Sequence, residues 1–458
     1  MELSYVIKIL DLMVNSIHFY KTDSKNWKEN KMDIGIFNKA YLYLNCGKKS
    51  IVIENRYTLS EKIDFNVLKK ALQNIIERFH YFKLKPVIDE NGNIDFVKNN
   101  AELNVYELDN KVYNLGTEEV NGYLFRISFQ DNDIYISISH AIADGRGAVL
   151  FGCSLIYEYL KLMGIKINLN DEVITNKTPI SETEMDTLTS NELDKMEEHC
   201  YEEPFVLPTN YQYFNTEYEK KTVISWNAEK FSNFIHQLKC TPVALITTII
   251  GNAIYKKYDV KEKKVLVSIP VDLRPFYQSK AQANFFTGIK LEFKKEYKDL
   301  QLKEQVRSIQ KALEEQLNIT NLKNNIYGTE NFFKTIVSKT IKTKAEAEKT
   351  SHELEEIMKL PEATYMLSNL GVINIPKQMQ PYITDYECTT SNTTLSTLYT
   401  MMTIGNVGKL VITQNDDSKI IMKEIVNTFL KNGIKVQVQD YGKIRMDAVV
   451  PYQFEKKL

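Results

Sequence analysis

One short stretch constrains the fold of this chain more than any other. Residues 137–152 read SISHAIADGRGAVLFG and set His140 directly after an apolar strand pattern, with Asp144 four residues further on and Gly145 beside it. The segment upstream alternates apolar and polar residues with period two, which predicts two strands joined by a polar turn. The segment downstream is an apolar helix pattern that ends at Gly164. The sequence therefore predicts strand, turn and helix, with a histidine displayed at the strand end.

A histidine at such a position is suited to proton transfer, because its ordinary pKa lies close to neutral pH. Asp144 lies too far along an extended chain to be a simple neighbour of His140, and the glycine behind it predicts a sharp turn. We expect Asp144 to point away from the reactive nitrogen of His140 and to brace the turn by pairing with a cation elsewhere. Gly145 is expected to leave room at the site that a side chain would fill.

Composition excludes several classes of function. At 458 residues the chain is too long for one ordinary core, which predicts two domains. A net charge of -1 gives no general attraction to nucleic acid, and no apolar stretch is long enough to span a bilayer. Five scattered cysteines form no Cys/His cluster, so we expect a cytoplasmic protein without disulfides and without a metal site.

A change of composition divides the chain. Residues 170–208 are rich in acidic residues and weak in apolar periodicity, which predicts an acidic crossover linker with solvated charges. It separates an N-terminal lobe, residues 1–169, from a C-terminal lobe, residues 209–458. Other local predictions are an amphipathic helix over 3–17, a strand at 41–44 and two charged helices between 302 and 359. The remaining histidines that we considered are expected to be structural or exposed: His80, His199, His236 and His352.

Three separated segments occur in an order that is jointly specific. They are the H-x-x-x-D-G motif at 140–145, the loop VDLRPFYQSKAQANFFTG at 271–288 with Arg274 and Asn284, and the strand end at Ser368 and Asn369. Together they resemble the thioester-dependent acyltransferase superfamily with the chloramphenicol acetyltransferase-like fold. The likeness is greatest to its bacterial alcohol acetyltransferase, polyketide-associated acyltransferase and condensation-domain branch. It runs from about residue 61 to about residue 438, and the first sixty residues match nothing that we can place.

The resemblance implies an α/β (α+β) protein with two chloramphenicol acetyltransferase-like lobes, each a mixed sheet flanked by helices. An active-site tunnel would run between the lobes. Only the first lobe carries the motif, so the chain would have one site and act as a monomer.

The resemblance also implies roles for individual residues. His140 would be the general base, and Asp144 would be a structural residue paired with Arg274. Ser368 or Asn369 would donate a hydrogen bond near the tetrahedral intermediate. Gly145 and Asn284 would belong to the structural surroundings of the site.

The implied reaction moves an acyl group from a thioester to an alcohol or amine. No cofactor would be bound permanently. Acyl-coenzyme A or acyl-phosphopantetheine would be the co-substrate, and an acyl carrier protein is a further possible partner.

Other interpretations stay open at this point. A free-standing condensation enzyme of nonribosomal peptide synthesis would form an amide, but that branch usually has a doubled histidine, and Ser139 precedes His140 here. A non-catalytic binding protein of the same fold is a second alternative. A serine hydrolase is weaker still, because no G-x-S-x-G motif occurs.

Overall fold

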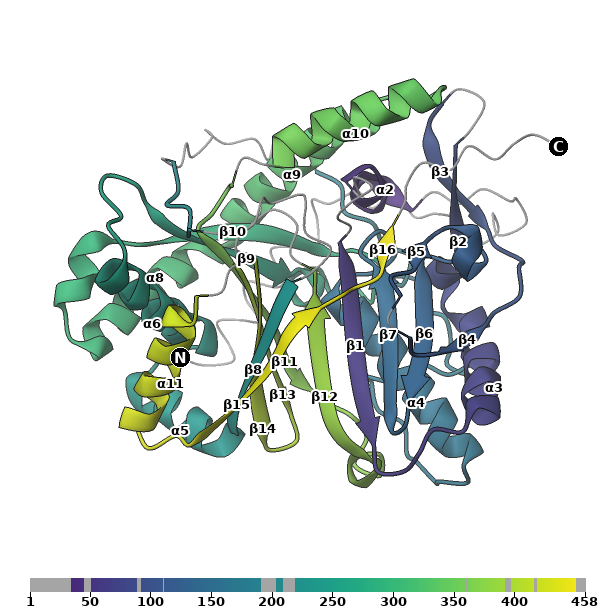
Figure 1. Cartoon of the computed structure of the whole chain (residues 1–458), viewed down its shortest axis with the longest axis horizontal. Helices are drawn as coiled ribbons and strands as arrows, with labels where there is room; N and C mark the ends of the chain where they lie inside the picture. Colours follow the sequence, from purple (N-terminus) through teal and green to yellow (C-terminus); the bar gives the residue numbers. More distant parts are fainter. Residues whose placement is uncertain are drawn as a thin grey trace.

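The computed structural model of the chain describes residues 34–44, 51–88, 92–109, 111–190, 203–208, 219–358, 361–391, 397–415 and 418–449. These residues form two lobes, each built on one large sheet with helices against it (Figure 1). The predicted α/β class with two mixed-sheet lobes is therefore confirmed. The amphipathic helix predicted over 3–17 lies outside the described residues.

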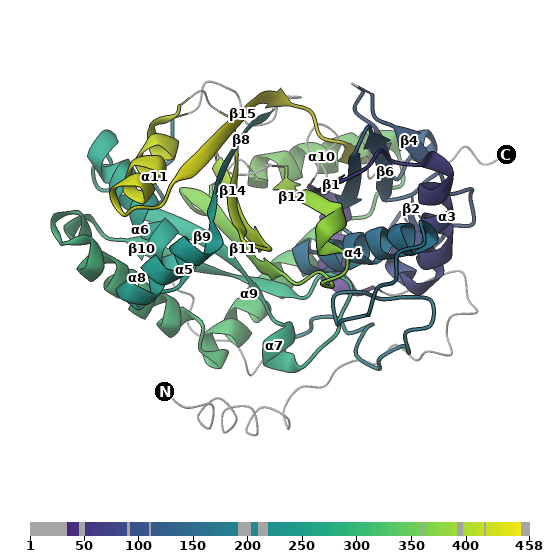
Figure 2. The same ribbon diagram turned by 90° about the horizontal axis from the view of Figure 1, so that it is seen from below.

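The first lobe contains a five-stranded sheet in the order β12-β1-β7-β6-β4. Its strands are β1 (Val52–Leu59), β4 (Val105–Glu107), β6 (Phe125–Gln130), β7 (Asp133–Ser139) and β12 (Ile383–Thr390). Helices α3 (Phe65–Ile75) and α4 (Gly145–Leu162) pack together on one side of it (Figures 1 and 2). Strand β1 alternates as its period predicts, so that Tyr57 is buried and its hydroxyl lies 3.7 Å from Cys153 Sγ of α4.

The second lobe contains a seven-stranded sheet in the order β10-β9-β11-β13-β14-β8-β15. Its strands are β8 (Glu219–Asn227), β9 (Val265–Asp272), β10 (Phe286–Phe293), β11 (Tyr365–Ile373), β13 (Thr397–Ile404), β14 (Val407–Gln414) and β15 (Val436–Ile444). The flanking helices are α5 (Ala228–Leu238), α6 (Pro242–Lys257), α8 (Leu302–Gln316), α9 (Ile319–Val337), α10 (Lys344–Met358) and α11 (Ile420–Lys431). Helix α6 is buried almost all round, as its continuous apolar pattern predicts.

The C-terminal half of the chain contributes to both lobes. Strand β12 pairs antiparallel with β1 in the first sheet, from Ile53 opposite Thr390 to Leu59 opposite Ile383. Near the end of the described chain, β16 (Ala448–Val449) pairs in parallel with β5 (Asn114–Leu115). The C-terminal half therefore ties the lobes together by giving strands to the first lobe, and the first sheet contains a strand from beyond the predicted boundary at residue 209.

Two local predictions are wrong. Residues 41–44 belong to helix α2 (Gly35–Leu44) and not to a strand. The region between 302 and 359 holds three helices, α8, α9 and α10, and not two. In both places the local pattern is ambiguous, and packing across the two lobes decides the structure.

The remaining histidines lie apart from one another in the chain, and no metal cluster or single membrane-spanning helix occurs among the described residues. His80 is partly buried, and this burial, with the Arg78 charge as the next cause, lowers its pKa to about 4. His236 and His352 are exposed, and His199 lies outside the described residues. Within the described chain no group of three or more His, Cys, Asp or Glu side chains is placed to hold a metal ion. No single described helix is long and apolar enough to cross a membrane, although the bent pair of α5 and α6 passes that test when both are taken together.

Candidate active site

His140 lies immediately after the last residue of β7, at the end of the first sheet. Its backbone N–H donates to the carbonyl of Ile51, at 2.9 Å, which extends the pairing of β7 with β1 by one residue. The chain then turns and enters α4 at Gly145. The histidine is thus displayed on a rigid strand end, as the sequence pattern predicts.

Asn284, in the loop before β10, holds the imidazole from the second lobe. Its Nδ2 donates to the carbonyl of His140 at 2.7 Å, and its Oδ1 lies 2.9 Å from His140 Nδ1. The first bond fixes the orientation of the amide, so that Oδ1 faces the ring and must accept from Nδ1–H. The tautomer that fits this arrangement carries its proton on Nδ1 and leaves a lone pair on Nε2.

The electrostatics of the site favour a neutral imidazole. Burial lowers the pKa of His140 below its ordinary value, and the charge of Asp144 and the bond to Asn284 oppose this shift only in part. Nε2 makes no hydrogen bond with any described residue, and this atom is not fully buried. The lowered pKa and the bond to Asn284 therefore favour a neutral ring whose Nε2 lone pair no described residue engages.

Asp144 points away from His140 and braces the turn. As the N-cap of α4, its Oδ1 accepts from the backbone N–H of Gly147 at 2.9 Å. Its Oδ2 accepts from the backbone N–H of Phe285 at 3.0 Å. Burial alone would raise the pKa of Asp144, but Arg274 and these backbone donors outweigh it and lower the pKa. Asp144 is buried, and its carboxylate joins the turn to the second lobe.

Arg274 supplies the cation that Asp144 requires. Its Nη1 lies 2.9 Å from Asp144 Oδ2, and its Nη2 lies 3.0 Å from Asp144 Oδ1. The same guanidinium donates to the carbonyls of Ala281 and Ala283, at 2.7 and 2.8 Å. One side chain therefore links the turn after His140 to the loop that presents Asn284.

Two glycines in the first turn of helix α4 allow close approach of the second lobe. A Cβ at Gly147 would lie 2.1 Å from the carbonyl oxygen of Gln282, and a Cβ at Gly145 would lie 2.6 Å from Leu370 Cδ2. Gly145 therefore leaves room for the side chain of Leu370 on β11. Gly147 has the tighter contact, although it lies outside the H-x-x-x-D-G motif.

Ser368 and Asn369 lie on β11, next to the Leu370 that packs against Gly145. Asn369 is exposed, and its Oδ1 accepts from the N–H of Gly371 at 3.0 Å. Neither side chain hydrogen-bonds to His140. The structure thus brings together His140, Asn284, Asp144, Arg274 and Gly145, while the catalytic role of Ser368 and Asn369 stays a prediction.

Two acidic residues of the segment after α4, Glu184 and Asp186, are buried and support this site, contrary to the expectation of solvated charges. Glu184 is 4% exposed, and its two carboxylate oxygens accept from Arg78 at 2.6 Å each. The carbonyl of Glu184 accepts from the N–H of Gln282 at 3.1 Å, and Asp186 accepts from Ser279 at 2.8 Å. Arg78 thus neutralises the Glu184 carboxylate, while the Glu184 carbonyl and Asp186 hold the loop of Arg274 and Asn284. Composition alone does not reveal these partners.

Comparison with known proteins agrees with the fold. No protein-family model matches the chain, and no curated protein sequence matches it. Polyketide synthase associated protein 5 from Mycobacterium tuberculosis superimposes with a TM-score of 0.59 and 12% identity, over 86% of this chain and 97% of that protein. The trichothecene 15-O-acetyltransferase of Fusarium sporotrichioides gives 0.55 and 11%, over 87% and 93%.

A second protein of F. sporotrichioides, solved with coenzyme A and T-2, gives a TM-score of 0.55 and 11% identity, over 89% of this chain and 99% of its own. Domains of nonribosomal peptide synthetases also match. The chain therefore has the two-lobed chloramphenicol acetyltransferase-like fold that the motifs suggest.

Proposed function

We propose that this protein is an acyltransferase that moves an acyl group from a thioester to an alcohol or amine, with His140 as the general base. The observation that carries the proposal is the pair of bonds between His140 and Asn284, at 2.9 and 2.7 Å. They leave Nε2 unprotonated and free, in a ring whose pKa burial has lowered. Among the proteins of this fold, one is an acetyltransferase and another was solved with coenzyme A, which supports the same class of reaction.

The reaction that we propose needs one base, and at the acyl carbon it forms one bond and breaks one bond. Nε2 of His140 takes the proton of the acceptor while the acceptor oxygen or nitrogen attacks the thioester carbonyl. A new C–O or C–N bond forms, and the carbonyl oxygen carries the negative charge of the tetrahedral intermediate. Collapse of this intermediate breaks the C–S bond, and the imidazolium returns the proton to the leaving thiolate. Asp144 takes no part in proton transfer, because its bonds go to Arg274 and the backbone.

Ser368 and Asn369 are the donors that we propose for the oxyanion. The amide nitrogen of Asn369 and the hydroxyl of Ser368 make no hydrogen bond with a described residue, so both donors are available. Removal of one oxyanion donor in other enzymes lowers kcat by about 10²-fold or more. Ser368→Ala and Asn369→Ala are expected to show which of the two acts. Loss of the donor that acts will lower kcat with little change in KM, and loss of the other will change neither.

The test is acceptor-dependent release of thiol. The protein is incubated with acyl-coenzyme A donors of increasing chain length, and separately with the same acyl groups on a phosphopantetheinylated carrier protein. Each donor is tried with and without a panel of alcohols and amines. We expect thiol release that requires an acceptor and is lost by about 10²-fold or more in His140→Ala with the melting temperature retained. Full turnover by His140→Ala, or no acceptor-dependent release with any donor, would contradict the proposal.

A further inference from the structure

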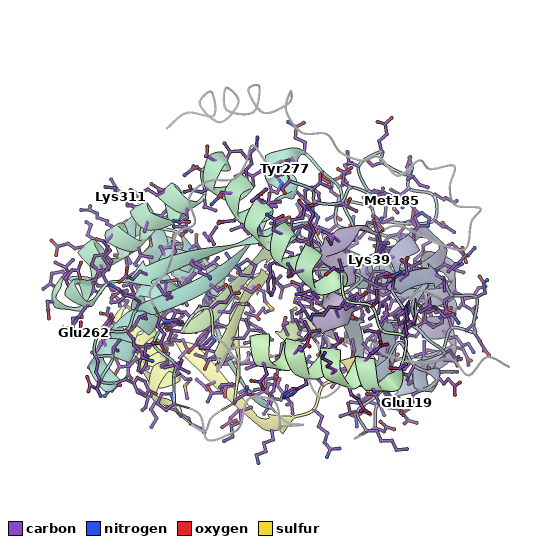
Figure 3. The ribbon with its side chains drawn as sticks, turned by 90° about the horizontal axis from the view of Figure 1, so that it is seen from above. Lys39, Glu119, Met185, Glu262, Tyr277 and Lys311 are labelled. Atoms are coloured by element: carbon purple, nitrogen blue, oxygen red, sulfur yellow. The ribbon has the colours of Figure 1, made fainter. Side chains whose placement is uncertain are left out.

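Helix α2 (Gly35–Leu44), from the part of the chain that no motif explains, lies over the turn that carries His140. Asn38 Nδ2 donates to the carbonyl of Ala141 at 3.0 Å. Tyr43 accepts from the N–H of Ile94 at 3.1 Å and donates to the carbonyl of Lys339 at 3.2 Å. Figure 1 shows this helix at the place where α9 and α10 reach the first lobe, and Figure 3 labels Lys39 on it. The helix is thus anchored to both lobes beside the base.

Tyr41 projects from this helix onto the imidazole of His140. The two ring centroids are 4.4 Å apart, and the rings lie within 10° of parallel. Phe286 is the other aromatic neighbour of the imidazole, at 5.5 Å from His140 and 6.5 Å from Tyr41. These three separations place Tyr41 and Phe286 at close to a right angle about His140. Tyr41 therefore covers one face of the imidazole, and Phe286 does not cover the opposite one.

The ring of Tyr41 is held by packing and not by its hydroxyl. Phe333 of α9 meets it edge to face at 6.0 Å, and Phe333 in turn contacts Phe37 of α2 at 5.2 Å. The Tyr41 hydroxyl makes no hydrogen bond with a described residue. The position of the ring is consequently set by aromatic contacts with both lobes, and its flat face is what it presents to His140.

We propose that Tyr41 is a positioning residue for His140. Asn284 fixes which nitrogen carries the proton, but one hydrogen bond to Nδ1 leaves the imidazole plane free to tilt. The face of Tyr41 removes that freedom and directs Nε2 at the acceptor. An aromatic face also attracts a cation, so it stabilises the imidazolium that forms during transfer. This inference rests on the proposed function and extends the active site to the N-terminal helix.

Two substitutions at one position test the proposal. Tyr41→Leu removes the flat face, and we expect kcat to fall about tenfold with KM for donor and acceptor within about twofold. Tyr41→Phe keeps the face and is expected to restore most of the lost kcat. Phe65→Leu, at a ring contact on α3 away from the site, controls for the loss of any aromatic pair. Equal losses in Tyr41→Leu and Tyr41→Phe, or no loss in Tyr41→Leu, would overturn the role of the ring face.

A second measurement does not depend on turnover. Diethyl pyrocarbonate modifies neutral, accessible imidazole, and peptide mass spectrometry follows the modification of His140 alone. The reagent attacks the in-plane lone pair of Nε2, so we expect Tyr41→Leu to be modified several times faster than the wild type and Tyr41→Phe, because a ring no longer held by the aromatic face can turn that lone pair towards the reagent. The same rate in all three proteins would overturn the proposal. If the wild type transfers no acyl group while these rates differ as expected, it is the proposed function that fails and not the contact between Tyr41 and His140.

Discussion

Asp144 and Arg274 form a two-bond ion pair across the two lobes, with Nη1 2.9 Å from Oδ2 and Nη2 3.0 Å from Oδ1. Their side chains are only 7% and 13% exposed. Asp144 also accepts from the backbone N–H groups of Gly147 and Phe285. Arg274 also donates to the carbonyls of Ala281 and Ala283. The pair is therefore the point where the turn after His140 and the loop of Asn284 are held in register.

Removing one partner of this pair is expected to destabilise the protein. Arg274→Ala leaves the buried Asp144 carboxylate without its cation, at a cost of about 3–5 kcal/mol. Asp144→Ala is expected to cost less, because Arg274 Nη1 keeps Asp272 Oδ1 at 2.9 Å. Differential scanning calorimetry should show a fall of several degrees in Tm for both variants, together with lower soluble yield. Lys62→Ala is the control, since Lys62 and Asp131 form a pair that is 83% and 73% exposed. Unchanged melting of both Asp144→Ala and Arg274→Ala would refute the structural role of the pair.

The two glycines of the turn should respond differently to a methyl group. In Gly147→Ala the new Cβ would lie 2.1 Å from the backbone oxygen of Gln282, so the loop of Asn284 must move. In Gly145→Ala the neighbour is the end of the flexible Leu370 side chain, which can shift. We expect Gly147→Ala to lose both stability and activity, and Gly145→Ala to lose less of each.

Gly328 provides the matched control for these two variants. It lies within α9, and a Cβ there would meet nothing within 4 Å. Gly328→Ala should stabilise the protein by up to about 1 kcal/mol, because alanine is favoured in a helix interior. Thermal melting and thiol-release rates of the three variants check the order. A Gly147→Ala protein as stable and active as Gly145→Ala would show that the close contact is not required.

The sequence predicts the elements whose patterns are local. The strand, turn and helix around His140 follow from period two, a glycine and an apolar helix pattern, and the structure has them with Asp144 as the helix cap. Asn284 and Arg274 were identified only through the resemblance, because nothing in the loop itself shows that it meets a turn 130 residues earlier.

The elements that the sequence does not predict depend on contacts between the lobes. Residues 41–44 read YLYL, an alternation that suits a strand, yet packing against α9 stabilises them as a helix. Strand β12 joins the sheet of the other half of the chain, and its partner β1 lies more than 320 residues earlier. Glu184 is buried because Arg78, 106 residues away, neutralises it. Such partners are set by the tertiary fold, which no local pattern records.

The bond between Asn284 and His140 should control the tautomer of the base. Asn284→Leu is similar in size but accepts nothing from Nδ1–H and donates nothing to the carbonyl of His140. We expect kcat to fall by about 10²-fold, because the proton of the neutral ring is no longer confined to Nδ1. Nitrogen NMR of the imidazole should show the Nδ1–H form in the wild type and a mixture in the variant. A variant that keeps the Nδ1–H form and full kcat would remove Asn284 from the mechanism.

The pH dependence of kcat/KM follows from the lowered pKa of His140. A general base works only when unprotonated, and a pKa below the ordinary 6.5 keeps the imidazole unprotonated to lower pH. We therefore expect the midpoint of the acid limb of kcat/KM to lie below pH 6.5. His80→Gln is the control, since burial, with the Arg78 charge as the next cause, also lowers the pKa of His80, to about 4, away from the site. An acid limb with its midpoint at or above pH 6.5, or one whose midpoint moves in His80→Gln, would show that the limb does not report a buried His140.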